Sequence, residues 1–226
     1  MHQGVKTAVF SLITVIYVLY TFVVPMEVND DAGYYLSLAN LYYLGYVPMV
    51  DISSSYTPLG IYIIGIPYLF FDQPLYEYHV LVNIVIGILC AIITYQLLSY
   101  NSKNKLDNFS VTILVLALNI VCGSAHISLE PISLLFQLFA IYIFKRNNDS
   151  FIHIFISGLF AALSFLAKQY GIFVIIPILF TFINEKKWSK VIIFFTGVIT
   201  PISILYSILI LNSELSFFAY VNNLLG

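Results

Sequence analysis

The chain has 226 residues, of which 61% are hydrophobic and 9% are charged, and its mean hydropathy is +0.96. This composition lies far outside the range of water-soluble domains and predicts a polytopic membrane protein. The formal net charge is only −2, so the positions of the charges along the chain carry more information than their sum, and no nucleic acid partner is expected.

Apolar stretches predict the membrane spans, because a hydrocarbon core about 30 Å thick requires roughly 20 helical residues. Three stretches have this length: residues 5–24, 80–100 and 191–211. The first exceeds the apolar region of a signal peptide and no small-residue cleavage site follows it, so it predicts a retained anchor. Four shorter stretches end at polar or helix-breaking residues and are expected to cross with polar ends lining a cavity: residues 109–123, 131–144, 151–167 and 172–183.

Residues 56–71 form one further apolar stretch, which is short, contains Pro58 and Pro67 and follows a polar loop. These features predict a re-entrant or interfacial helix rather than a crossing. The expected fold is therefore an all-α polytopic bundle of about seven spans, forming a single transmembrane domain over residues 1–226.

Loop charges orient this bundle, because Lys and Arg accumulate on the cytoplasmic side. If Lys6 is cytoplasmic, seven crossings leave Lys168 as the only external cation and place most of the acids outside. We therefore expect a multi-pass protein of the cell membrane with a cytoplasmic N-terminus, in which chemistry that needs carboxylates faces outside. Most of the remaining polar sequence lies in the first external loop, residues 25–79, and such long loops are usually functional.

A short helix is predicted in this loop by "NDDAGYYLSLANLYYLG". Leu36, Ala39 and Tyr43 would form its apolar face, Gly45 would end it, and the helix would lie along the membrane surface. One interpretation of the acids is structural, with Asn29 or Asp30 capping the helix and the next acid favoured by its dipole. The other is catalytic: one carboxylate acts as a general base while its neighbour holds a metal or orients the first.

The loop also contains many tyrosines, which have two interpretations. As an aromatic belt they would mark the membrane interface, which is the interpretation we favour for each of them. As ligands they would offer flat faces and hydroxyl groups to a sugar. The tyrosines concerned are Tyr34, Tyr35, Tyr42, Tyr43 and Tyr46.

The loop resembles that of a known family. An acidic pair after the first span, then "GYYLSLAN", "GYVPMVD" and "YTPLGIYIIGIPYLFF", is similar to the first external loop of GT-C glycosyltransferases of the protein O-mannosyltransferase and aminoarabinose transferase type. The resemblance implies transfer of a sugar, with inversion, from a polyprenyl-phosphate carrier to a glycan, lipid or protein acceptor on the outer face. It maps the catalytic base onto Asp30 and the second acid onto Asp31. Many relatives carry a basic residue before the Pro-Leu of this loop, where this chain has Tyr56 and Thr57.

One carboxylate is sufficient for this chemistry, because it removes the proton of the attacking hydroxyl, whereas the leaving phosphate needs cations or a metal. Lys168, in "FLAKQYGIF", has two interpretations. It caps the preceding helix and snorkels to the interface, or it contacts the phosphate. The segment is similar to a Lys-containing turn of the family, which supports the phosphate contact.

Glu130 precedes Pro131 at an external helix start and is either a simple cap or, as the resemblance implies, a group lining the active-site cavity. His126 stands four residues earlier, so both side chains would reach one ligand or a divalent metal. The expected metal ligands are Asp31 and Glu130. The expected substrate-binding residues are Lys168, Glu130, His126, Tyr34 and Tyr56.

Family members are longer than this chain, so we expect either a short relative or the N-terminal portion of a longer or split enzyme. Two other functions remain open. A transporter or flippase-like protein would show charged or broken segments at mid-membrane and internal repeats. A truncated, non-catalytic subunit would keep the fold without activity.

Overall fold

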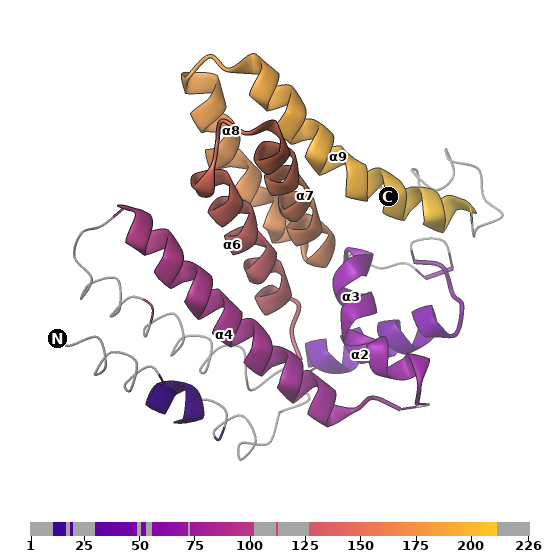
Figure 1. Ribbon diagram of the computed structural model, residues 1–226. Coiled ribbons are helices and arrows are strands. Elements are labelled where there is room, and N and C mark those ends of the chain that lie inside the picture. Colours follow the sequence, from indigo (N-terminus) through magenta and orange to yellow (C-terminus); the bar gives the residue numbers. More distant parts are fainter. Residues whose placement is uncertain are drawn as a thin grey trace.

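The computed structural model describes residues 11–16, 19, 30–48, 51–52, 56–71, 73–101, 112 and 127–211. Within this part of the chain every element is helical apart from one isolated bridge between Pro48 and Ile52 (Figure 1). The predicted all-α fold class is confirmed for these residues. Most of the predicted spans at 5–24 and 109–123 lies outside the described residues.

Two of the described helices are long and apolar enough to cross a membrane, namely α4 (Tyr76–Asn101) and α9 (Trp188–Leu211). Three shorter described helices lie between them in the chain: α6 (Glu130–Arg146), α7 (Phe151–Ala167) and α8 (Ile175–Asn184). The helix α8 continues from the 3₁₀ turn η2 (Gln169–Val174). Large apolar side chains such as those of Ile192, Ile199 and Ile204 are more than half exposed along α9. Such a surface suits lipid rather than water.

The helices α6, α7 and α9 pack side by side with α7 between the other two (Figure 1). Gly158 and Gly197 allow the backbones of α7 and α9 to approach closely, because a Cβ on Gly158 would lie 2.3 Å from the carbonyl oxygen of Phe194. Small residues at membrane helix interfaces permit this kind of contact. On the other face of α7, the hydroxyl of Ser157 donates a 2.8 Å hydrogen bond to the carbonyl of Ala140 in α6.

The segment predicted as the first external loop contributes α2 (Asp30–Tyr43), and Gly45, the residue predicted to end this helix, lies in the turn that follows it. Gly45 has a φ of 98°, and the N–H groups of Gly45 and Tyr46 donate to the carbonyls of Tyr42 and Leu41 at 3.2 and 3.1 Å. This is a Schellman motif, which favours glycine because its backbone is left-handed.

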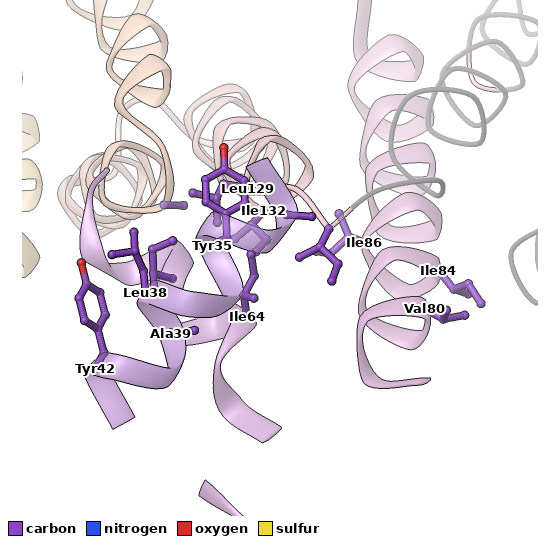
Figure 2. Packing of buried hydrophobic residues seen from close by; sticks show 14 of the residues in the cluster. Tyr35, Leu38, Ala39, Tyr42, Ile64, Val80, Ile84, Ile86, Leu129 and Ile132 are labelled. Carbon is purple, nitrogen blue, oxygen red and sulfur yellow. The ribbon is translucent and has the colours of Figure 1, made fainter. Parts of the chain in front are cut away.

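The buried face of α2 differs from the predicted one. Ala39 is buried as expected, but Leu36 and Tyr43 are only partly buried. The fully buried positions are Ala32, Tyr35, Leu38, Ala39 and Tyr42. Figure 2 shows Tyr35, Leu38 and Ala39 in one hydrophobic cluster with Ile64 and Leu129. The aromatic-belt interpretation is therefore wrong for Tyr35 and Tyr42, whose rings belong to the core.

Residues 56–71 form two short helices, α3 (Pro58–Ile64) and the 3₁₀ turn η1 (Ile66–Leu69). A helix of seven residues spans about 10 Å, which agrees with the prediction that this segment does not cross the membrane. Gly60 lies against the end of α7, since a Cβ there would be 2.4 Å from the carbonyl oxygen of Ala167. This close approach brings the start of α3 next to the residue that follows Ala167.

Candidate functional site

Lys168 is the centre of the candidate site, directly after α7. Its side chain is only 8% exposed. The ammonium group donates hydrogen bonds to Oε1 of Glu130 at 2.6 Å and to the hydroxyl of Tyr35 at 3.1 Å. These contacts join the end of α7 to the start of α6 and to α2.

Local structure explains why Lys168 points to this place. The backbone of Lys168 is extended (φ −155°, ψ 138°), which ends α7, and its N–H donates to the carbonyl of Ser164 at 3.1 Å. Ser164 and Ser133 exchange hydrogen bonds, each hydroxyl donating to the other residue's carbonyl at 3.0–3.1 Å. These buried bonds tie α6 to α7 about one turn from Glu130 and Lys168, so they set the separation of the two charged groups.

Aromatic rings surround the ammonium group of Lys168. Its nitrogen lies 5.5 Å from the ring centroid of Tyr35, 5.1 Å from that of Tyr56 and 5.9 Å from that of Tyr170. Ring faces at this distance attract cations. Tyr56 also meets Tyr35 edge-on at 5.0 Å and Tyr34 at 5.8 Å. The four tyrosines thus form, with Lys168, a single polar and aromatic cluster.

Both carboxylate oxygens of Glu130 accept hydrogen bonds, Oε1 from Lys168 and Oε2 from the hydroxyl of Ser128 at 2.5 Å. The Glu130 side chain is nevertheless 56% exposed, so the ion pair joins a buried cation to an anion that reaches the surface. Glu130 is the partner of Lys168 that faces solvent.

These contacts stabilise the charged forms of Glu130 and Lys168. Burial acts to raise the pKa of Glu130, but the hydrogen bonds from Lys168 and Ser128 outweigh it and lower the pKa. Burial acts to lower the pKa of Lys168, while the bonds to Glu130 and Tyr35 raise it. Burial is also the main reason that the pKa of Tyr35 rises to about 12. At neutral pH the cluster is a carboxylate, an ammonium and an uncharged phenol.

The arrangement bears on the predicted metal site. Both oxygens of Glu130 accept hydrogen bonds, one from an ammonium and one from a hydroxyl, so a metal at this carboxylate would compete with Lys168 and Ser128. Among the residues that the structure describes, no group of three or more His, Cys, Asp and Glu side chains gathers around a common point. The metal roles expected of Asp31 and Glu130 remain predictions.

The other predicted site residues are placed as follows. Asp31 is exposed in the first turn of α2, one turn before Tyr35. Asp30 is the first residue of α2, and its side chain lies outside the described part of the chain, as does the whole of His126. Tyr34 is 41% exposed and stands at the open side of the aromatic cluster.

Three residues that contribute contacts to the candidate site were not predicted as site residues: Tyr35, Ser128 and Tyr170. Tyr35 was included among the belt tyrosines, although its spacing from Ala32 and Ala39 is that of a buried helical face. Ser128 and Tyr170 each stand two residues from a predicted site residue, but that proximity in sequence alone carries little information. Only the three-dimensional contacts identify them.

Comparison with known proteins adds no family: no family model, curated protein or solved structure matches the chain.

Proposed function

We propose that the chain is a multi-pass membrane glycosyltransferase of the GT-C type, which moves a sugar from a polyprenyl-phosphate carrier to an acceptor at the outer face. In this proposal the bundle has about seven spans, its N-terminus is cytoplasmic, and the Lys168 cluster faces outside. Two apolar helices of sufficient length, and an exposed apolar surface on α9, support the membrane part of the proposal.

The observation that carries the proposal is the contact of Lys168 with Glu130 and Tyr35. Lys168 is separated in sequence from Glu130 by 38 positions and from Tyr35 by 133 positions. The same three segments, together with the one around Tyr56, are those in which the sequence resembles the family. Convergence in space of segments that each resemble the family supports a common site.

Each group then has a role in a displacement at the anomeric carbon. Asp30 accepts the proton of the acceptor hydroxyl while the acceptor oxygen bonds to that carbon. The bond from the anomeric carbon to the phosphate oxygen breaks, and its electron pair leaves with the polyprenyl phosphate. Lys168 stabilises the phosphate charge. Tyr34 and Tyr56 present aromatic faces to the sugar.

The test compares Asp30→Asn with Asp31→Asn in purified protein. The measurement is release of polyprenyl phosphate from a panel of polyprenyl-phosphate sugars, because this product is common to all donors. Loss of a general base lowers rates about 10²–10⁴-fold, so we expect a loss of that order in Asp30→Asn and a smaller one in Asp31→Asn.

A wild-type protein that releases polyprenyl phosphate equally well after Asp30→Asn contradicts the proposal. Equal expression of both variants, measured by size-exclusion chromatography in detergent, is the control for folding. The two substitutions remove one charge each from adjacent positions, so a general electrostatic effect would lower both rates alike.

A further inference from the structure

We propose that Glu130 is a resident anion at Lys168, which a phosphate group of the ligand displaces when it binds. The inference rests on the proposed function for the identity of the ligand, but the exchange itself follows from the geometry of the cluster. Glu130 therefore competes with the ligand for Lys168, so removing the charge of Glu130 tightens binding of the ligand.

The neighbours of Lys168 determine how an anion can reach its ammonium group. Of the described groups around the ammonium of Lys168, Tyr35 is 2% exposed and belongs to the core cluster, so it cannot move aside without disrupting packing. Glu130 is 56% exposed and stands at the first residue of α6. An anion can therefore reach the ammonium most easily by taking the place of the carboxylate.

Charge favours exchange of the anion over addition of a second one. A buried ammonium needs a partner, and in the free protein Glu130 supplies it at 2.6 Å. A second anion placed beside an intact pair would meet a neutral pair and, at short range, a like charge. A phosphate oxygen that replaces Oε1 of Glu130 keeps Lys168 paired, while the displaced carboxylate moves into solvent, where its hydration is recovered.

Few contacts hold the carboxylate of Glu130 in place. Ser128 donates to its second oxygen at 2.5 Å, and the hydroxyl belongs to a residue only two positions away. The carboxylate is thus held by one hydrogen bond from Ser128, one from the backbone N–H of Glu130 itself and one ion pair, and more than half of the side chain is exposed. Removing the Ser128 hydroxyl loosens the competitor without changing any charge.

Aromatic rings remain around the ammonium group after the exchange. Tyr56 and Tyr170 lie with their ring centroids 5.1 and 5.9 Å from the ammonium, and Tyr170 is 65% exposed. Ring faces keep the cation in place by an interaction that needs no anion. The cluster is therefore expected to remain assembled when the carboxylate leaves.

The experiment measures phosphate binding to the purified chain in maltoside micelles, which carry no phosphate. Farnesyl phosphate, monitored by ³¹P NMR, represents a lipid headgroup, inorganic phosphate in calorimetry represents the free anion, and farnesol is the uncharged control. Removing the charge of Glu130 weakens its charge-assisted hydrogen bond with Lys168, which the phosphate must displace, and a bond of this kind corresponds to a Kd lower by a factor of about ten or more. We expect Glu130→Gln to bind phosphate about tenfold more tightly than wild type, and Lys168→Gln to lose binding.

Tighter binding of farnesyl phosphate alone identifies a lipid phosphate as the ligand, and tighter binding of both probes identifies the phosphate group itself. Glu130→Gln that binds both probes no more tightly than wild type overturns the inference. If Glu130→Gln does not fold, Ser128→Ala decides: about threefold tighter binding is expected from loss of one neutral donor, and unchanged binding refutes the exchange. The two proposals are tested by different measurements: loss of transfer in Asp30→Asn tests the general base, whereas the phosphate affinity of Glu130→Gln relative to wild type tests the exchange and requires no transfer.

Discussion

Substitution of Gly60 by Ala probes the contact that places α3 beside the candidate site. A Cβ at this position would lie 2.4 Å from the carbonyl oxygen of Ala167 and 2.9 Å from Cδ2 of Leu129. Neither neighbour can yield easily, because one is backbone at the end of α7 and the other is fully buried. Since non-bonded atoms rest about 3.5 Å apart or more, α3 must move away from α7 by roughly 1 Å.

The expected cost follows from two opposing effects. Overpacking of this kind destabilises a fold by about 1–3 kcal/mol, while Ala in place of Gly in a helix restores up to about 1 kcal/mol. We expect Gly60→Ala to lose about 1–2 kcal/mol, which corresponds to a Tm lower by about 2–8 °C in a chain of this size. The displacement would also lengthen the 5.1 Å separation between the Tyr56 ring and the Lys168 ammonium.

The assay is thermal unfolding in detergent, monitored by circular dichroism. Gly33→Ala is the matched control, because Gly33 lies within α2 and a Cβ there would have no neighbour within 4 Å. It should raise Tm slightly, since Ala reduces the entropy of the unfolded chain. The argument for a tight contact between α3 and α7 fails if Gly60→Ala is as stable as Gly33→Ala.

Three other measurements follow from the same structure. The pKa of Glu130 is lowered on folding, so its ion pair stabilises the protein fully above the ordinary pKa of 4.5, and this contribution is lost as the pH falls through the lower folded pKa. The Tm difference between wild type and Glu130→Gln should therefore shrink below pH 4.5. A Tm difference that does not depend on pH contradicts this prediction. The pKa of Lys168 is raised, so its contribution is present below 10.5 and declines as pH rises through the higher folded value. Tyr35→Phe keeps the buried ring but removes the hydroxyl that accepts the 3.1 Å hydrogen bond from Lys168. It should lower the free energy of unfolding, measured by denaturant titration, by about 1 kcal/mol. An unchanged free energy of unfolding would show that this bond contributes nothing. Phe70 is 74% exposed shortly before α4, so the fluorescence of Phe70→Trp in a Trp188→Phe background should be quenched by brominated lipids. Unquenched fluorescence with an emission maximum typical of water would place residue 70 outside the bilayer.

Local features of the sequence determined the helical elements. The low charge and high hydropathy predicted a helical membrane protein, Gly45 predicted the end of α2, and Pro58 with Pro67 predicted that residues 56–71 do not cross. The helical class, the turn at Gly45 and the short helices of residues 56–71 agree with the structure, because glycine φ angles and proline geometry act within a few residues. Membrane crossing itself remains a prediction. The number of spans remains a prediction, since the described residues contain two helices of sufficient length.

Tertiary packing decided which face of α2 is buried. The sequence offered an apolar face through Leu36 and Tyr43, yet Tyr35 and Tyr42 take the core positions. A tyrosine has an apolar ring and a polar end, so its pattern in sequence fits a membrane interface and a protein core equally well. The choice was made by what stands opposite α2, including the ammonium of Lys168.

The pairing of Lys168 with Glu130 was likewise decided by the fold. Charge distribution predicted that both lie on the outer side, and left each with a separate capping or substrate role. Their 2.6 Å contact depends on the distance between α6 and α7, which the bonds between Ser133 and Ser164 set, and on the approach of α3 at Gly60. Such distances arise from residues far apart in the chain, so no local pattern contains them.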